Sequence, residues 1–414
     1  MDDKTLYAAI LGVKQPWSVE QVELRLAHGE VHVWVALPPD TLWVCPDCQA
    51  PAPIHDHRER VWRHLDTCQY RTLVHARVPR LVCPTHGTRQ LRVPWADENS
   101  RFTALFEALT IEWLKHAAIA TVADQLRLSW DEAAGIQARA VARGLQRREL
   151  APTQHLGIDE TAFQRRHEYV TVVTDLDRAR VLYVADTRRR ESLDAFWAAL
   201  PPAGRDAITA VAMDMWEPYI ESTRAHLPEA DTKIVFDKFH IAQHANHAVD
   251  LVRRQEHRVL TAEGKDWLAG TKYDWLRHPD RFSLGAWRTF LGFLRRTKLK
   301  TGRAWALKET LMTLWEYVHP GAAARHFEAW YRWAIRSRLE PMKRVARMLR
   351  RRWPNIVTFF THGITNAGAE SMNSKIQKIK ILARGFRNRD RFKQAIYFHL
   401  GGLDLAPDSL RTPA

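Results

Sequence analysis

The sequence contains little cysteine and no long uninterrupted apolar stretch. Only four cysteines occur among 414 residues, and their placement suggests metal binding rather than disulfides. No apolar run approaches the roughly 20 residues that a membrane-spanning helix requires. The opening residues, "MDDKTLYAAILGVKQPW", lack the basic flank and the long apolar core of a signal peptide. Together these features predict a cytosolic protein.

Acidic residues are also in short supply relative to basic ones. The chain has 62 Lys and Arg against 47 Asp and Glu, for a formal net charge of +15 and a sequence pI near 9.9. This excess indicates a polyanionic partner, nucleic acid first and an anionic membrane surface second. The alternative is a ribosome-associated or merely basic protein. The hydrophobic fraction of 46% predicts a globular chain, long enough for two or three domains.

Two short motifs carry paired metal ligands. "CPDC" places Cys45 and Cys48 at the spacing of a zinc knuckle, and "CPTH" places Cys83 and His86 at the same spacing. The strand-like sequence between them predicts that the knuckles sit at the ends of a β-hairpin-like unit, with a closed structural zinc site. Cys68 is left over and is predicted to be a buried small residue. Rival ligands without the paired spacing are His55, His57 and His64.

The order of predicted elements changes along the chain. Short strands are expected over 1–43, including the alternating "EVHVWVAL", and helices over 100–150. Three β-like runs beginning at 155 are followed by alternating helix and strand patterns, which predicts a mixed sheet with helices packed on it. Residues 241–355 are almost all helical and rich in Trp, most of which we expect in a core. Residues 366–400 form a further helical segment with a basic centre.

A helix-turn-helix candidate lies in "ATVADQLRLSWDEAAGIQARAV". Ser129 is placed to cap the second helix, and Glu132 follows three residues later as in a capping box. Gln137 and Arg139 are the polar candidates for DNA contact on that helix. The alternative is an ordinary helical hairpin, and the acidic start "WDEAA" is unfavourable for meeting phosphates.

Three distant acids form the candidate catalytic set. Asp159 is predicted to end the first strand of the mixed sheet, Asp214 ends the strand "AITAVAMDM", and Glu370 lies on a late helix beside small residues. Singly, each acid could be a turn, cap or helix-dipole residue. Jointly, three converging carboxylates need cations and favour Mg²⁺ or Mn²⁺, two of which support phosphodiester displacement. Asp237 is the reserve second aspartate, and His240 either orients a phosphate or packs.

The motifs "CPDC…CPTH", "GIDE", "VAMDMWEPY", "FDKFHIAQHANHAVDLVRR" and "ITNAGAESMNSKIQKIKILARGFRN" together resemble a transposase of the ISL-three family of bacterial insertion sequences. The resemblance covers about residues 40–403. It implies an Asp-Asp-Glu triad formed by Asp159, Asp214 and Glu370, with two Mg²⁺ or Mn²⁺ ions. His86 stands where a fourth Cys would be usual, and zinc accepts either ligand.

The resemblance also implies an organisation. We expect an α/β fold: a zinc-binding β domain over 1–95, a helix-turn-helix segment over 96–150, and a ribonuclease-H-like catalytic domain over 151–403. That domain has a mixed sheet and a large all-helical insertion at about 241–355. Basic residues after Glu370 would lie along DNA phosphates, although a solvated helix face is the alternative. They are Lys375, Lys378, Lys380, Arg384, Arg387 and Arg389.

The function implied is a bacterial DNA transposase that cleaves element ends and transfers the 3′-hydroxyl into target DNA. Its expected partner is double-stranded DNA, both terminal inverted repeats and target, bound by a homodimer or larger assembly. It would be cytoplasmic and associated with the nucleoid when bound, with no membrane partner. The alternatives are a non-catalytic DNA-binding regulator that keeps the fold, and a structure-specific nuclease that cuts without joining.

Overall fold

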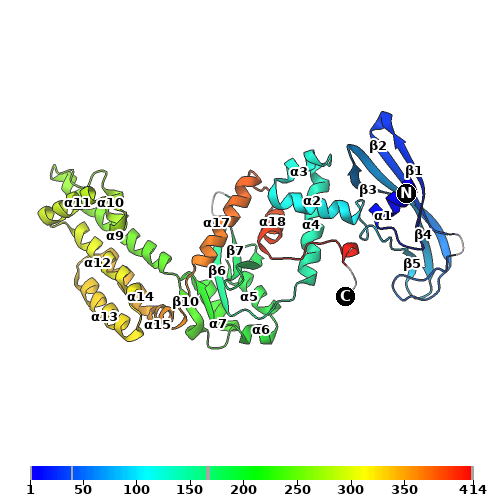
Figure 1. Ribbon diagram of the computed structural model, residues 1–414. Helices are drawn as coiled ribbons and strands as arrows, with labels where there is room; N and C mark the ends of the chain where they lie inside the picture. Colours follow the sequence, from blue (N-terminus) through cyan, green and yellow to red (C-terminus); the bar gives the residue numbers. More distant parts are fainter. Residues whose placement is uncertain (1, 39–40, 165–167, 412–414) are drawn as a thin grey trace. The chain divides into compact units, whose positions relative to one another are not determined.

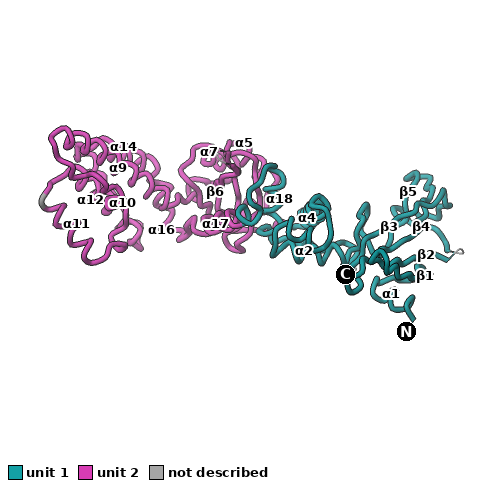
Figure 2. Tube along the Cα trace, turned by 90° about the horizontal axis from the view of Figure 1, so that it is seen from above, with its two compact units in different colours: residues 1–149, 379–414 teal, residues 150–378 magenta. Residues whose placement is uncertain are grey.

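The computed structural model describes residues 2–38, 41–164 and 168–411, and the chain divides into two compact units. Unit 1 comprises residues 1–149 and 379–414, and unit 2 comprises residues 150–378 (Figure 2). The chain therefore enters unit 2 once and returns to unit 1 within one late helix. In the described part of the chain, no helix is both long and apolar enough to cross a membrane.

Unit 1 begins with a five-stranded sheet. Its strands are β1 (Ser18–Arg25), β2 (Glu30–Ala36), β3 (Ile54–Thr67), β4 (Tyr70–Cys83) and β5 (Gly87–Gln90), in the order β1-β2-β4-β3 with β5 on β4 (Figure 1). Strands β3 and β4 form a long antiparallel hairpin, whereas β2 and β4 run parallel. The core beneath the sheet includes the buried side chains of Val33, Trp62 and Val74. The predicted strand "EVHVWVAL" is thus confirmed as β2.

The first helix corrects one expectation. Residues predicted as short strands form α1 (Asp3–Leu11) instead. The Asp2 carboxylate accepts from the backbone N–H of Thr5 at 2.7 Å, and Gly12 closes the helix in the left-handed conformation with φ 63°. The caps at Asp2 and Gly12 therefore stabilise a helix here, although the hydrophobic pattern of this short segment does not clearly predict one.

Helices complete unit 1. They are α2 (Ala104–His116), α3 (Ile119–Gln125), α4 (Trp130–Arg147) and α18 (Arg389–Leu400). The predicted capping box is confirmed, because Ser129 and Glu132 satisfy each other's backbone N–H groups at the start of α4. Helix α18 contributes Phe398 to the same apolar cluster as Ile136 on α4. The contacts therefore place residues 379–403, which we expected in the catalytic domain, with the helix-turn-helix.

Unit 2 contains the second five-stranded sheet, in the order β10-β9-β6-β7-β8. Its strands are β6 (His155–Gln164), β7 (Glu168–Asp175), β8 (Arg180–Ala185), β9 (Ala210–Met213) and β10 (Ile234–Phe236). Strands β6, β7 and β8 are successively antiparallel, and β9 and β10 run parallel to β6. The helices between the later strands are α5 (Arg190–Ala199), α6 (Pro202–Asp206), α7 (Glu217–His226) and α8 (Ala230–Lys233). The mixed sheet with packed helices is as predicted.

A helical region follows β10. Its α-helices are α9 (Lys238–Ala262), α10 (Lys272–Leu276), α11 (Leu284–Thr297), α12 (Lys300–Met312), α13 (Pro320–Arg336), α14 (Glu340–Arg351), α15 (Trp353–Val357) and α16 (Phe359–His362), before α17 (Ala367–Leu382). Trp275 and Trp330 are fully buried, as expected of core aromatics, whereas Trp267 and Trp333 are exposed. The region is helical throughout, as the sequence predicted.

Candidate functional site

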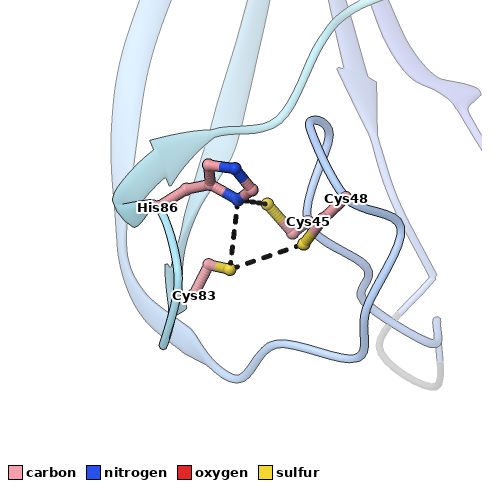
Figure 3. Close-up of side chains that lie close together, drawn as sticks. All are labelled: Cys45, Cys48, Cys83 and His86. Atoms are coloured by element: carbon pink, nitrogen blue, oxygen red, sulfur yellow. Dashed lines mark hydrogen bonds between the residues drawn. The ribbon is translucent and has the colours of Figure 1, made fainter.

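Four predicted zinc ligands come together in unit 1. The ligand atoms of Cys45, Cys48, Cys83 and His86 all lie within 4.8 Å of one another (Figure 3). The Sγ atoms of Cys48 and Cys83 are 3.6 Å apart, and His86 Nδ1 lies 3.6 Å from Cys83 Sγ and 3.8 Å from Cys45 Sγ. A tetrahedral ion with Zn–S bonds of about 2.3 Å would separate two sulfurs by about 3.8 Å. The donor set and its spacing therefore fit a closed structural zinc site.

The β3–β4 hairpin explains why distant ligands meet. Cys45 and Cys48 precede β3, Cys83 ends β4, and His86 lies in the turn before β5. Antiparallel pairing of the two 14-residue strands returns the chain to its starting end. Backbone N–H groups of His86 and Thr85 donate toward the Cys83 sulfur and lower the pKa of that thiol to about 7. A lowered thiol pKa favours the thiolate that a metal needs.

The remaining cysteine and the rival histidines lie outside this cluster. The prediction that Cys68 is buried is wrong: it is exposed in the turn joining β3 to β4, with φ 56°. A two-residue hairpin turn places side chains in solvent and needs positive φ. His64 is buried, and its Nδ1 lies 2.8 Å from Thr103 Oγ1, so it links β3 to the start of α2. His55 is next to the carboxylate of Asp56 at 3.2 Å.

The helix-turn-helix is formed by α3 and α4. Gln137 on α4 is buried at 6% exposure, and Arg139 donates to the buried Glu107 at 2.5 Å. The acids that made the start of α4 unfavourable for DNA are partly neutralised. Asp131 lies 3.4 Å from Arg391, and Glu132 lies 3.6 Å from Arg101.

A groove in unit 1 joins this motif to the predicted basic segment. The groove has a volume of about 1350 Å³ and lies between α3–α4 and residues 382–394. Gln137, Arg384 and Arg387 all line it, so the structure brings together DNA-binding candidates from two distant segments of the chain. Lys380 is half-buried over the Phe392 ring, with Nζ 5.9 Å from its centroid. Lys375 and Lys378 are exposed on the part of α17 that belongs to unit 2.

Strand register aligns three aspartates in unit 2. Ile158 on β6 pairs with Met213 on β9, and Met213 pairs with Phe236 on β10. An aspartate follows each of these residues: Asp159 lies within β6, and Asp214 and Asp237 come directly after the ends of β9 and β10. Neighbouring strands are ~4.8 Å apart, so these acids form a row across the parallel strands β6, β9 and β10. Asp214 and Asp237 lie at the carboxyl ends of their strands, where ligand sites are common. Asp159 lies in the middle of β6 rather than at its end, because β6 continues to Gln164.

Helix α17 brings Glu370 to the same place. Its start crosses β6 closely: a Cβ on Gly157 would be 3.1 Å from that of Ala369. The Asn373 amide, one turn later, donates to Asp159 Oδ2 at 2.8 Å and to the Glu160 carbonyl at 3.2 Å. These contacts fix the register of α17 on the sheet. Glu370 in turn lies close enough to Asp237 for the two carboxyl groups to interact.

His240 is the centre of this acidic cluster. Its Nδ1 lies 3.0 Å from Asp237 Oδ2, and its Nε2 lies 4.0 Å from Asp214 Oδ2. Burial alone would lower the pKa of His240, but the bond to Asp237 and the charges of Asp214, Asp237 and Asp159 raise it to about 9. This raised pKa favours the protonated imidazole at neutral pH.

Two of the carboxyl groups in the cluster have raised pKa values. Burial raises the pKa of Asp159 to about 6, against the opposing effects of the Glu160 N–H and the charge of His240. Burial and the charge of Asp237 raise the pKa of Glu370. Four carboxyl groups, those of Asp159, Asp214, Asp237 and Glu370, thus lie around one imidazole. Among the described residues, only Cys45, Cys48, Cys83 and His86 form a group of at least three His, Cys, Asp or Glu gathered closely enough to hold an ion, so the carboxyl oxygens around His240 are more dispersed.

Sequence reasoning missed Asn373 and left Asp237 and His240 undecided. Asn373 carried no signal beyond standing three residues after Glu370, one turn of helix. Asp237 and His240 had a usable signal, because a short apolar strand ends at Asp237 and a helix starts there. Asp237 caps that helix by accepting from the Phe239 N–H at 3.1 Å.

Comparison with known families shows which family the chain belongs to. A family model described as a transposase, of the ISL3 type, matches residues 156–396, which is more than half of the chain. The chain belongs to the ISL3 family of transposases. Two further models match the rest of the family's organisation: the zinc-finger of transposase IS204/IS1001/IS1096/IS1165 over 41–86, and the helix-turn-helix domain of transposase family ISL3 over 91–141. The predicted zinc and helix-turn-helix regions are confirmed.

Two curated relatives cover nearly the whole chain. A transposase for insertion sequence element IS1557 from Mycobacterium tuberculosis is 27% identical over 419 residues, covering 94% of this chain and 93% of the relative. A transposase for insertion sequence element IS1001 from Bordetella parapertussis is 27% identical over 386 residues, covering 92% and 95%. The family membership and the helix-turn-helix indicate an insertion-sequence transposase that binds DNA.

Proposed function

We propose that this transposase cleaves the ends of an insertion sequence and joins the freed 3′-hydroxyl to target DNA, with Asp159, Asp214 and Glu370 as its catalytic carboxylates. The observation that carries the proposal is the shared register of Ile158, Met213 and Phe236, which aligns the aspartates that follow them. The strand order supports a ribonuclease-H-like sheet, with three antiparallel strands followed by two parallel ones on the other side of β6. The helices from α9 to α16 form the insertion before Glu370.

The acidic cluster fits divalent cations. Four carboxyl groups face one imidazolium, and Asp159 is buried enough for its pKa to rise to about 6. Hard carboxylate oxygens are the ligands that Mg²⁺ and Mn²⁺ prefer. Asp159, Asp214 and Glu370 would hold them. When bound, a pair of such ions supplies charge stabilisation for the attacking and leaving oxygens of an in-line phosphodiester displacement.

The chain's own groups prepare that displacement. Asn373 donates to Asp159 Oδ2 and the Glu160 backbone N–H donates to Oδ1, each at 2.8 Å, so the orientation of this carboxylate is held. Asp237 holds His240 Nδ1, which leaves Nε2 directed toward Asp214. A cationic imidazole in this position is suited to donate to a non-bridging phosphate oxygen and to orient the scissile phosphate. The same site would act twice, first with water and then with the 3′-hydroxyl as nucleophile.

Recognition of the terminal repeats is assigned to unit 1. The helix-turn-helix and the zinc-bearing sheet would contact the repeats, with Arg384 and Arg387 in the groove beside α4. Arg389 and Lys380 extend this basic segment, and Lys375 and Lys378 would contact phosphates nearer Glu370. Because two ends must be processed together, we expect a homodimer or larger assembly on DNA.

The test is a cleavage and joining assay with labelled element ends, supercoiled target and Mg²⁺. The single variants Asp159→Asn, Asp214→Asn and Glu370→Gln should each lower cleavage by about 10³-fold or more while DNA binding is kept. Gel-shift affinity for the same ends is the control. Cleavage without joined product would instead indicate a nuclease. Absence of wild-type cleavage with any divalent ion would favour a regulator.

A further inference from the structure

The helical region of unit 2 contains a cavity that the proposed chemistry does not use. It has a volume of about 890 Å³, within the range of small-molecule pockets. Its walls come from the first turns of α9, from α10 and the segment after it, and from α12. Lys238, Phe239, Ala242 and Asn246 form one stripe of α9, at helical spacing, along one wall.

Two exposed aromatic rings line this cavity. Phe239 is 52% exposed and Tyr273 is 69% exposed, whereas most large apolar side chains of the helical region are buried. Rings left in solvent at the mouth of a cavity lack an apolar partner within their own fold. They suit a planar ligand that stacks on them.

The charges around the cavity favour an anion. Lys238, Arg277 and Arg281 line it, and the nearby acid is Asp280, which lies 3.5 Å from the His278 ring. The other ionised pair neutralises itself: buried Lys308 lies 2.5 Å from Glu309 and also donates to the Trp275 carbonyl at 3.2 Å. Three cations against one further acid, Asp280, leave a positive rim around an aromatic interior.

Among the described residues that line the cavity, one buried polar atom has neither a hydrogen bond nor an ion pair. The side-chain oxygen of Asn246 is buried, and no hydrogen-bond donor reaches it among the described residues. Buried amide oxygens are nearly always hydrogen-bonded, since an unmade bond costs stability. A ligand carrying an amino or imino N–H would satisfy this oxygen.

The cavity adjoins the acidic cluster through α9. Lys238 and Phe239 lie between Asp237 and His240 in the chain, and the rings of Phe239 and His240 meet edge to face with centroids 6.0 Å apart. A group bound in the cavity therefore touches the same helical turn that holds His240.

We propose that this cavity receives one nucleotide of the DNA substrate, swung out of the base stack beside the cleaved phosphate. Its base stacks on Tyr273 and Phe239 and donates an N–H to Asn246, while Lys238, Arg277 and Arg281 contact the adjoining phosphates. Aromatic faces, a positive rim and one orphan acceptor together match a nucleobase attached to a phosphate backbone. This inference rests on the proposed cleavage of element ends, which it refines by giving the helical insertion a substrate-positioning role.

The experiment uses the full chain and element-end duplexes with a single 2-aminopurine at successive positions around the cleaved phosphate. We expect the probe at one position to change its fluorescence on binding, because its base leaves the stack. In Tyr273→Ala the same probe should be brighter, because the ring that quenches it is lost. Tyr273→Ala should also slow single-turnover cleavage about tenfold, in line with the loss of one base–aromatic contact. Tyr273→Phe should restore both. Trp333→Ala, an exposed aromatic outside the cavity, is the matched control and should change neither.

A duplex with an abasic nucleotide at the responding position provides a second readout. With no base to bind, wild type and Tyr273→Ala should cleave it at equal rates. Two results would overturn the inference and leave the proposed function standing, provided that the wild type cleaves. In one, no probe position changes its fluorescence on binding; in the other, Tyr273→Ala has the fluorescence and cleavage rate of the wild type. Free dAMP that displaces the responding base, so that the probe returns to its stacked fluorescence level, would also overturn the inference and indicate a mononucleotide site. The fluorescence assay needs only DNA binding, so it separates this inference from a failure of cleavage itself.

Discussion

The zinc ligands are held by one hairpin, whereas the acidic residues around His240 come from separate elements of unit 2. In the hairpin, two knuckles meet because β3 and β4 pair along their length, and four ligand atoms converge within 4.8 Å. In the acidic cluster, three strands and α17 each contribute a carboxyl group, and the groups remain spread around an imidazolium. Thiols and a neutral imidazole tolerate close approach without a metal, but carboxylates repel. A closed structural site and an open reactive one differ in this respect.

The largest expected effect concerns the zinc ligands. Cys83→Ser should abolish stoichiometric zinc binding and unfold the surrounding part of the sheet, because structural zinc contributes on the order of 10 kcal/mol in zinc-finger peptides. Cys68→Ser removes an exposed thiol in the turn at the hairpin's other end and should keep one zinc per chain. Native mass spectrometry gives the stoichiometry. Equal zinc loss in both variants would show that the cluster is not the site.

A smaller effect separates the two central aspartates. Asp214→Asn should lower the cleavage rate by about 10³-fold, as expected for a metal ligand. Asp237→Asn should lower it only about 10–100-fold, as expected for a residue that orients His240. The reason is geometric: Asp237 is committed to His240 and to the cap of α9, while Asp214 is half-exposed. Single-turnover rates at saturating Mg²⁺ measure both.

The reverse order of effects would make Asp237 the second catalytic aspartate. His240→Gln is the companion variant, and it should resemble Asp237→Asn if the two residues act as a pair. A double variant no slower than either single one would support that pairing.

His64, which is buried on β3 of the zinc-bearing sheet, should make the stability of unit 1 depend on pH. Burial lowers the pKa of His64 to about 4. Between that value and the unfolded pKa of about 6.5, the unfolded chain binds the extra proton, so stability is full above this range and falls as pH drops through it. The free energy of unfolding should fall by about 1–2 kcal/mol from pH 7.5 to pH 5.5.

Urea unfolding of unit 1, followed in excess zinc, measures this change. His64→Gln keeps a hydrogen-bonding group for Thr103 but does not titrate, so its stability should vary less over the same pH range. An identical pH dependence in both proteins would show that His64 does not cause the acid sensitivity. The comparison thus isolates the hairpin's own stability from that of its metal site.

Local patterns predicted the zinc centre and the capping of α4, because the residues that matter lie within a few positions of each other. They did not predict that Cys68 is exposed, because this residue lies in the turn between β3 and β4. The sequence pattern predicts that Asp159 ends its strand, yet pairing with β7 extends β6 to Gln164. Sequence signals of strand length are weaker than the pairing that decides it.

The acidic cluster could be predicted only in part. Strand-end acids were visible, but the alignment of Asp159, Asp214 and Asp237 depends on strand register, which no local pattern specifies across long separations. The Asn373–Asp159 bond depends on α17 crossing β6 at Gly157. The packing of α18 with α4 likewise joins segments some 250 residues apart, and only the fold shows it.

The smallest expected effect tests whether DNA follows α17 past Glu370. Lys378 is exposed there, so Lys378→Ala should weaken binding to element ends about threefold and reduce the slope of log affinity against log salt by about 0.9, the loss of one phosphate contact. Lys265→Ala is the matched control, because its ammonium is already paired with Glu263 at 2.8 Å. Fluorescence anisotropy over a salt series measures both quantities. An unchanged slope for Lys378→Ala would make this face of α17 a solvated surface, and the path of DNA from the acidic cluster would then have to follow other cations.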